Sequence, residues 1–320
     1  MSELESLDLE PIIEQFSALR SAVSQVVVGQ EEAVRLAFIT LLCSGHSLIE
    51  GVPGVAKTSL VRTLASALDV RFGRLQFTPD LMPSDIIGTP VLDPRVGQFE
   101  FRRGPMFTDL LLADEINRAS AKTQAALLEA MQERSVTVDG ETYDMGPYFT
   151  VFATQNPVEQ EGTYPLPEAE LDRFLFKIVM DYPSEQEERE LLVRHHAGDP
   201  LAVSVPPAIE AGSLDGVRRL VSRIIVRDEI VDYVANLVRA TRADFQFALG
   251  ASPRAGLLLL RAAKASAALE GRDYVLPEDV QEMFFPVLRH RVILDPASEV
   301  EGLTPDRALE RSLRTLSVPR

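Results

Sequence analysis

The sequence predicts an α/β domain built on a parallel β-sheet, followed by a smaller all-α domain. Three observations lead to this prediction. A short apolar segment at 46–49 has the length of a strand and runs into a glycine-rich loop that opens a helix. Two further apolar segments, 109–113 and 148–154, read as buried strands separated by helical patterns. Beyond residue 213 the pattern is helical almost throughout.

Length and composition set the broad class of the protein. The chain has 320 residues, enough for about two domains, and its 46% hydrophobic and 25% charged residues are ordinary for a soluble globular protein. A net charge of −16 disfavours nucleic-acid binding, because an acidic surface repels the phosphate backbone. The single cysteine, Cys43, offers no disulfide framework. An acidic N-terminus and the lack of a long apolar run predict no signal peptide and no membrane span, and hence a cytoplasmic protein.

The loop after the first strand has the composition of a nucleotide-phosphate cradle. In such a loop, backbone N–H groups and the N-terminus of the following helix attract phosphate oxygens. Lys57 would neutralise these oxygens, and the Thr58 hydroxyl would ligate Mg2+. The strict pattern has glycine where this chain has Ala56, and its methyl group is tolerable if φ stays negative. The candidate binding residues are Gly51, Val52, Pro53, Gly54, Val55, Ala56, Lys57, Thr58 and Ser59.

Two amphipathic helices, over 11–26 and 31–43, precede the first strand. Val28, Gly29 and Gln30, between these helices, are candidates for the wall of an adenine pocket.

Beyond the loop, residues 74–77 read as a second strand, and 78–85 as a polar stretch broken by prolines. Alternation around a Gly-Gln turn predicts a hairpin over 95–104, inserted where a crossover connection would otherwise run.

Two carboxylates directly follow the buried strand 109–113. In a parallel sheet ligands bind beyond the carboxyl ends of the strands, so Asp114 and Glu115 would emerge beside the phosphate loop. Asp114 would hold Mg2+ through water, and Glu115 would polarise the attacking water as general base. A helix-capping pair is the alternative, which two carboxylates in this context disfavour.

A third strand ends at another polar residue. After a helix over 121–133, residues 135–143 predict a hairpin with a type I′ Asp-Gly turn. The strand 148–154 then runs into Asn156, whose neutral amide could orient a water molecule without competing for its proton. An asparagine before a proline is also a common turn former, so the position alone is not decisive.

Arg173 lies just before the last strand of the sheet, 175–180. It either forms a local ion pair with the neighbouring aspartate or reaches the nucleotide of a neighbouring subunit, where a guanidinium stabilises the transition state. Sequence alone favours neither interpretation.

The C-terminal part follows a charged helix over 184–195 and a linker within 197–207. Ser252 as N-cap and Pro253 at the first position predict a helix start. Arg254 then lies in the first turn, where the helix dipole opposes a cation, so an anionic partner such as phosphate would suit it. A plain surface arginine is the alternative.

The order of these motifs resembles that of the AAA+ ATPases, and most closely that of the MoxR family. The motifs are GVPGVAKT at 51–58, LLLADEINR at 110–118, ATQNP at 153–157, EAELDRF at 168–174 and GASPRA at 250–255.

The resemblance implies a P-loop AAA+ three-layer domain with a parallel sheet and β-hairpin insertions over 1–198. It further implies a linker over 199–212 and an α-helical lid domain over 213–320. The two hairpins would be the helix-2 and pre-sensor-1 insertions of that clade.

The resemblance also implies roles for single residues, with Ala56 usual in the loop of this family. The implied roles are Walker A for Lys57 and Thr58, Walker B for Asp114 and Glu115, sensor 1 for Asn156, a trans-acting arginine finger for Arg173 with Arg118 as the alternative, and sensor 2 for Arg254.

The resemblance finally implies an activity and partners. MoxR-type proteins are expected to form hexameric rings, hydrolyse Mg-ATP, and act as chaperones that mature or activate partner proteins or insert a metal or cofactor. A partner with a von Willebrand factor A domain and a protein client are further expectations. Turnover would change the angle between the α/β domain and the lid. The alternatives are a magnesium-chelatase-like subunit, an MCM-like DNA motor, or a scaffold that binds ATP but barely hydrolyses it.

Overall fold

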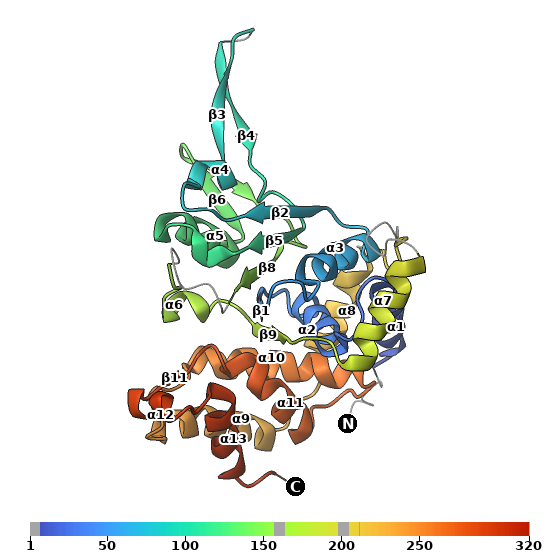
Figure 1. Cartoon of the computed structure of the whole chain (residues 1–320), viewed down its shortest axis with the longest axis vertical. Helices are drawn as coiled ribbons and strands as arrows, with labels where there is room; N and C mark the ends of the chain where they lie inside the picture. The colour runs from blue at the N-terminus through green and yellow to red at the C-terminus, as the bar shows by residue number, and fades with distance from the viewer. Residues whose placement is uncertain (1–6, 96, 157–163, 198–204, 211, 320) are drawn as a thin grey trace, which may run out of the picture.

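The computed structural model describes residues 7–95, 97–156, 164–197, 205–210 and 212–319. The predicted boundary at residue 198 and much of the predicted linker lie outside these ranges, as do Pro157 of the strand-end motif and Val96 of the first hairpin. The described chain forms an α/β body and a helical C-terminal part, which we call the lid (Figure 1).

A five-stranded parallel sheet forms the centre of the body. Its order is β2-β5-β8-β1-β9, so the first strand lies inside the sheet rather than at its edge. The strands are β1 (Ser47–Gly51), β2 (Phe72–Gln76), β5 (Leu110–Asp114), β8 (Thr150–Gln155) and β9 (Phe176–Met180).

Helices cover both faces of the sheet and give a three-layer arrangement. Along β5, Leu110 and Leu112 belong to one core cluster, whereas Leu111 and Ala113 belong to the other, because successive side chains of a strand point to opposite faces. The first cluster contains α1 (Glu10–Ser24), α2 (Glu31–Leu42) and α3 (Lys57–Ala67), and the second contains α5 (Ala121–Glu133).

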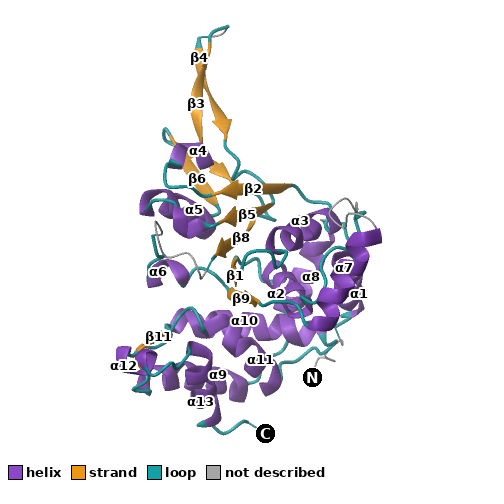
Figure 2. Ribbon diagram, viewed as in Figure 1, coloured by secondary structure: helices purple, strands orange, loops and turns teal. Residues whose placement is uncertain are grey.

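Two β-hairpins interrupt the α/β pattern, as predicted. The first joins β3 (Gly88–Asp93) to β4 (Gln98–Arg103) after the short helix α4 (Pro83–Ile87), and Figure 2 shows it projecting away from the body. It begins at Gly88, not near residue 95, because its first strand pairs over its full length with β4. The second joins β6 (Ser135–Val138) to β7 (Glu141–Asp144). Its turn has φ of 50° at Asp139 and 86° at Gly140, as a type I′ turn requires.

The lid is helical, as predicted, apart from one short strand pair. The antiparallel strands β10 (Phe247–Leu249) and β11 (Ile293–Leu294) were not expected from the helical pattern. The predicted N-cap at Ser252 is confirmed, since its hydroxyl accepts a hydrogen bond from Ala255 N at 3.4 Å. The helices are α8 (Ser213–Ser222), α9 (Asp228–Ala243), α10 (Pro253–Leu269), α11 (Pro277–Leu288), α12 (Pro296–Val300) and α13 (Pro305–Arg314).

The helix α6 (Glu168–Leu171) lies between β8 and β9, and α7 (Glu185–Ala197) follows β9 on the way to the lid. The described part of the linker lies on the body, because Ala208 N and Ile209 N both donate to Ala67 O at the end of α3, at 2.8 and 2.9 Å.

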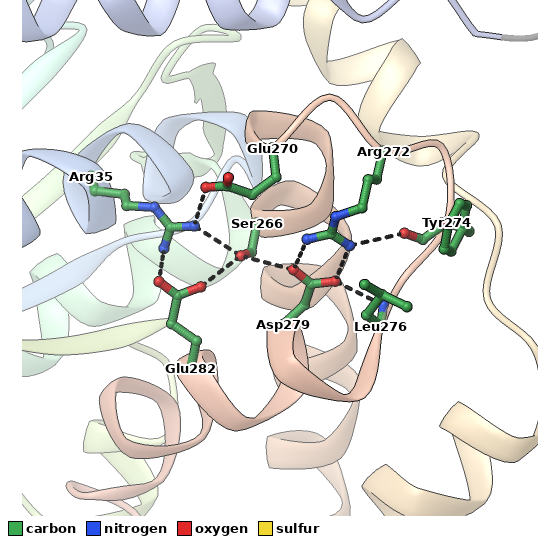
Figure 3. A network of polar contacts seen from close by, with 8 residues as sticks. All are labelled: Arg35, Ser266, Glu270, Arg272, Tyr274, Leu276, Asp279 and Glu282. Carbon is green, nitrogen blue, oxygen red and sulfur yellow. Dashed lines mark hydrogen bonds and ion pairs between the residues drawn. The ribbon is translucent and has the colours of Figure 1, made fainter. Parts of the chain in front are cut away.

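Polar contacts fasten the lid to the body through Arg35 of α2 (Figure 3). This guanidinium donates to Glu282 Oε1 at 2.6 Å, Ser266 Oγ at 3.0 Å and Glu270 Oε1 at 3.4 Å. Because all three partners lie at or beside α10 and α11, one side chain of the body binds two lid helices. A single hydrophobic cluster also runs from α1–α3 into the lid, so the two parts share one core.

Candidate active site

The carboxyl ends of three neighbouring strands form the candidate site. The register pairs Glu50 of β1 with Gln155 of β8, and Ala113 of β5 with Ala153 of β8. The phosphate loop, the carboxylates after β5 and the amide after β8 therefore emerge at one edge of the sheet. These groups come from distant parts of the sequence and meet as the strand-end reasoning expected.

The loop has a backbone suited to an anion. Gly51 is required by packing, because a Cβ there would lie 2.5 Å from Met180 O on the adjacent strand. Gly54 adopts a φ of 89°, and Ala56 adopts 64°, so the expectation of a negative φ at Ala56 is wrong. The loop enters α3 through Ala56, whose backbone is in the left-handed region. Glycine adopts this conformation at a lower cost in free energy than alanine does. The residue at this position is therefore under backbone strain, about 1–2 kcal/mol.

The N-terminus of α3 offers free N–H groups for such an anion. No side chain caps this helix, and its first turn contains no acidic residue. Thr58 and Ser59 lie in that turn and are half-buried. Uncapped N–H groups and the helix dipole together favour a bound phosphate.

Lys57 folds back over the loop, where its Nζ donates to Gly51 O at 2.6 Å. Burial lowers the pKa of the Lys57 ammonium, whereas the charges of Asp114, Glu115 and Glu50 act in the opposite direction. The lysine is therefore held in a partly desolvated, acidic surrounding beside the loop, where a phosphate would be a favourable partner.

Asp114 is buried and its carboxylate has two kinds of partner. Its Oδ2 accepts from Arg74 Nη2 at 2.7 Å and from Arg74 Nε at 3.2 Å. Its Oδ1 accepts from Thr154 Oγ1 at 2.6 Å. Because the Arg74 side chain is 43% exposed, this guanidinium can turn outward and leave the carboxylate to another cation. A carboxylate that already faces a cation offers oxygen donors of the kind that Mg2+ prefers.

The described residues contain no cluster of three or more His, Cys, Asp or Glu side chains suited to a metal. A cation at this edge would therefore depend on Thr58, Asp114 and the oxygens of the nucleotide itself, with water in the remaining positions. This donor set fits Mg2+, which is usually bound by one or two carboxylates and substrate phosphates.

Glu115 is held in a strained backbone conformation beside Asp114. Its φ is 56°, in the left-handed region, and its N–H donates to Thr154 Oγ1 at 2.9 Å. Its Oε2 accepts from Arg118 Nη1 at 3.0 Å and from Gln76 Nε2 at 3.4 Å. Arg118, the alternative arginine finger, thus lies against the carboxylate of its own chain.

Two other predicted contributors lie close to these groups. Asn156 follows β8 and is 8% exposed, so its amide is buried at the same sheet edge. Gln30 Nε2 donates to Asp181 O at 3.0 Å, next to Met180, which pairs with Gly51. The segment 28–30 therefore lies near the carboxyl end of β9, the strand next to β1. It lines a cavity of about 200 Å³ together with charged residues that include Glu187 and Arg194, so the cavity wall is more polar than an adenine pocket would suggest.

Arg173 lies at the opposite end of the sheet. Leu175 N donates to His46 O at 2.6 Å, and Phe176 pairs with Ser47 at the start of β1. Strands of five residues span about 16 Å, so Arg173 is separated from the loop of its own chain by roughly the length of a strand. The local ion pair considered for it is not formed, because Asp172 pairs with Arg291 of the lid at 2.8 Å.

Arg254 lies near Arg173 rather than near the loop contacts described above. Ser252 Oγ, two residues before Arg254, donates to Asp172 Oδ2 at 3.1 Å. Arg254 itself is exposed in the first turn of α10, as predicted. Neither Arg173 nor Arg254 has a side-chain ion pair within the described part of the chain, so both guanidinium groups are available to an anion.

Three residues of the site were missed from the sequence. Thr154 joins Asp114 to Glu115 through its hydroxyl, and Arg74 and Gln76 on β2 contact the two carboxylates. A usable signal was present, since Arg74 and Gln76 are polar residues two apart on one face of an internal segment, and Thr154 is the last hydroxyl of an apolar strand.

The described helices include none long and apolar enough to cross a bilayer.

Comparison with known proteins identifies the family. Residues 46–176 match the ATPase family associated with various cellular activities (AAA), and residues 239–312 match the AAA lid domain. The chain is 45% identical over 307 residues to the chaperone MoxR1 of Mycobacterium tuberculosis, covering 93% of this chain and 81% of that protein. It is 36% identical over 331 residues to the protein MoxR of Paracoccus denitrificans, covering 95% and 96% of the two chains. A crystal structure of a Cytophaga hutchinsonii protein superposes with a TM-score of 0.88 at 40% identity, covering 97% and 98% of the two chains. Because these two relatives match nearly the whole chain at 36% and 45% identity, and the AAA and AAA lid models match its two parts, this chain belongs to the MoxR family of AAA ATPases.

Proposed function

We propose that this chain hydrolyses ATP with Mg2+ in a ring of identical subunits, and that the turnover drives maturation or activation of client proteins. The observation that carries the proposal is the meeting of an uncapped helix N-terminus, two carboxylates and a buried amide at one edge of the sheet. Each of these groups has a distinct use in phosphoryl transfer.

The loop and α3 would bind the triphosphate. The first-turn N–H groups of α3 donate to phosphate oxygens, and Lys57 exchanges its bond with Gly51 O for a phosphate oxygen. Thr58 and Asp114 would hold Mg2+, with Arg74 turning away from the carboxylate. The metal, when bound, neutralises charge that develops on the phosphate oxygens.

Glu115 would act as general base on the attacking water. Its bond to Arg118 fixes the carboxylate while Gln76 holds the same oxygen, so the base is oriented before the water arrives. Its second oxygen, Oε1, would accept a hydrogen bond from the water. Asn156 would orient that water, since an amide can donate and accept without taking up its proton.

Arg173 and Arg254 would act on the nucleotide of a neighbouring subunit. The support is their position near the amino end of β9, about a strand length from the loop of their own chain. Two unpaired guanidinium groups on one surface suit a triphosphate presented by a second copy. This extends to Arg254 a trans role that the sequence suggested only for Arg173.

The biological role is supported by the relatives. One relative bears the name of a chaperone, MoxR1 of Mycobacterium tuberculosis. We propose that the present chain likewise acts on protein clients, as a hexameric ring and with a von Willebrand factor A domain protein as partner. Metal or cofactor insertion into a client is a more specific form of the same proposal.

The test is substitution of Glu115 by Gln, with exposed Glu129 of α5 changed to Gln as the matched control. We expect Glu115→Gln to bind ATP with nearly unchanged affinity and to lose at least about 100-fold in turnover, because a general base contributes about 10²–10⁴-fold. Glu129→Gln should match wild type in both measurements. Retention of full turnover by Glu115→Gln would remove this residue from the proposed role.

A further inference from the structure

One buried arginine of the lid contacts the turn that carries Arg173. Arg291 follows α11, and its side chain is 1% exposed. Its guanidinium donates to Asp172 Oδ1 at 2.8 Å, to Asp172 O at 3.0 Å and to Leu175 O at 3.2 Å. It also donates to Phe174 O. The carbonyl groups on both sides of Arg173 are therefore bound by a single side chain of the lid.

Burying the Arg291 guanidinium is unfavourable in free energy, and the ion pair with Asp172 offsets this desolvation. Burial lowers the pKa of Arg291 to about 10, and the opposing effect comes from Asp172. A buried guanidinium that lost its carboxylate would remain charged and poorly solvated. The carboxylate of Asp172 is thus needed to keep Arg291 in contact with the 172–175 backbone.

The same carboxylate also reaches the first turn of α10. The other oxygen of Asp172, Oδ2, accepts from Ser252 Oγ at 3.1 Å. Ser252 is the N-cap of α10, and Arg254 lies in its first turn. His290 adds a further contact from the lid, since its Nε2 lies 3.1 Å from Phe174 O. The turn of Arg173 and the helix start of Arg254 are therefore fixed to one another through a single side chain.

We infer that Asp172, Ser252 and Arg291 form a brace that positions Arg173 relative to Arg254, so that the two arginines are presented to a neighbouring subunit as one unit. The inference rests on the proposed function, in which both arginines serve the nucleotide of that neighbour. Any change in the angle of the lid would then be transmitted to Arg173. The three residues are positioning residues, because none of them is expected to touch the nucleotide.

The alternative is an ion pair that only holds the lid in place. Buried ion pairs often contribute little net stability compared with apolar residues of similar size. A purely structural role predicts a loss of stability without any specific effect on hydrolysis in the neighbouring subunit. The two interpretations therefore make different predictions for a mixed ring. The brace predicts slower ATP hydrolysis in the neighbour of the altered subunit, whereas a purely structural role predicts no such effect.

The lid offers a matched control for this test. Arg272 binds both oxygens of Asp279, at 2.6 and 2.7 Å, and the Asp279 side chain is 3% exposed. This pair is shown in Figure 3, and the residues drawn with it do not include the Arg173 turn. Asp279→Asn removes a carboxylate charge that pairs with an arginine of the lid, as Asp172→Asn does, but leaves the brace intact.

The first measurement compares steady-state hydrolysis of Asp172→Asn, Asp279→Asn and Arg173→Ala, with thermal unfolding of each. We expect Asp172→Asn to lower kcat by about 100-fold with little change in KM for ATP, because small misplacement of a transition-state group costs about that much. Asp279→Asn should lower the unfolding temperature but keep kcat within about twofold. In the Arg173→Ala background, Asp172→Asn should cause no further loss of kcat. Equal kcat losses for the two Asn variants, or additive losses with Arg173→Ala, would overturn the brace.

The second measurement uses mixed rings. Asp172→Asn subunits keep their own Glu115, and Glu115→Gln subunits keep an intact Arg173, so an equimolar mixture should hydrolyse ATP several-fold faster than the sum of the two variants alone. Arg173→Ala mixed with Glu115→Gln provides the reference. Recovery in the reference pair without recovery for Asp172→Asn would overturn the brace but not the trans role of Arg173. Failure of the reference pair, with mixed rings formed, would overturn that trans role and the brace together.

A second variant covers the possibility that Asp172→Asn does not fold. Arg291→Lys keeps a positive charge beside Asp172 but cannot donate to several carbonyl groups at once, since an ammonium lacks the planar fork of a guanidinium. The same kcat loss and the same recovery with Glu115→Gln are expected. An Arg291→Lys variant with wild-type kcat would contradict the brace.

Discussion

Thr154 offers a sharp test of how the two carboxylates are held. Its hydroxyl donates to Asp114 Oδ1 at 2.6 Å and accepts from Glu115 N at 2.9 Å, and the residue is 1% exposed. Thr154→Val keeps the shape of the side chain but leaves a buried N–H and a carboxylate oxygen without this partner. Each lost partner costs about 1–3 kcal/mol. We therefore expect a loss of about 2–5 kcal/mol in the free energy of unfolding, from two such groups partly offset by relaxation.

The same strand supplies the control. Thr150 is fully buried on β8, and its Oγ1 has no hydrogen-bond partner within the described structure. Thr150→Val replaces an unsatisfied hydroxyl by a methyl group, so it should be neutral or stabilise the protein by about 1 kcal/mol. The two variants make the same chemical change at positions four residues apart. Their changes in the free energy of unfolding should differ in sign, or by about 2–5 kcal/mol.

Urea unfolding without nucleotide measures the stability of both variants, and steady-state hydrolysis measures the effect on Glu115. We expect Thr154→Val to lower kcat by about 10- to 100-fold, because the strained backbone of Glu115 loses the bond that fixes it. Thr150→Val should leave kcat unchanged. Equal stability changes in the two variants, or wild-type kcat in Thr154→Val, would refute this account of the carboxylate pair.

Three further predictions concern the loop and the core. Burial lowers the pKa of His46 from 6.5 to about 3, so the unfolded chain takes up a proton first as the pH falls. The contribution of His46 to stability should be complete above about pH 6.5 and fall by about 1.4 kcal/mol per pH unit towards pH 3. The buried His290, whose pKa is also lowered by burial, adds to the same dependence. Urea unfolding of a His46→Gln variant should therefore show a shallower dependence of stability on pH, and an unchanged slope would contradict this origin. Gly51→Ala should weaken ATP binding and cost about 1–3 kcal/mol, since its Cβ meets Met180 O at 2.5 Å; a wild-type melting curve would exclude the clash. Ala56→Gly should relieve the left-handed strain and leave stability unchanged or raised by up to about 1 kcal/mol, whereas a clear loss in calorimetry would mean that φ is negative there.

The position of the site could be predicted from the sequence because one geometric rule determines it. Parallel strands deliver their carboxyl ends to one edge, so a loop after β1, carboxylates after β5 and an amide after β8 had to meet once the strands were recognised. The hairpins were also recognisable, because alternation and turn residues are local signals. The full extent of the first hairpin could not be recognised locally. Its first strand begins at Gly88, which is defined only by its pairing with Arg103, fifteen residues further along the chain.

The remaining features depend on contacts that no local pattern contains. The partner of Asp172 is Arg291, which lies 119 residues further along the chain, so the neighbouring Arg173 looked like an equally good candidate. The sign of φ at Ala56 is set by the turn between Gly54 and α3, and residue type alone favoured the wrong sign. Thr154 looked like an ordinary strand residue, because only the neighbouring strand reveals what its hydroxyl binds.

The central claim is that one triphosphate and its metal are bound where the loop, Asp114 and Asn156 meet. Anomalous diffraction from crystals grown with Mn2+ in place of Mg2+, and with a non-hydrolysable ATP analogue, tests this directly. We predict a single strong peak between Thr58 and Asp114, with the Arg74 guanidinium displaced from Asp114 and the triphosphate at the N-terminus of α3. A nucleotide bound elsewhere, or Arg74 still paired with Asp114 beside a fully occupied loop, would contradict the account.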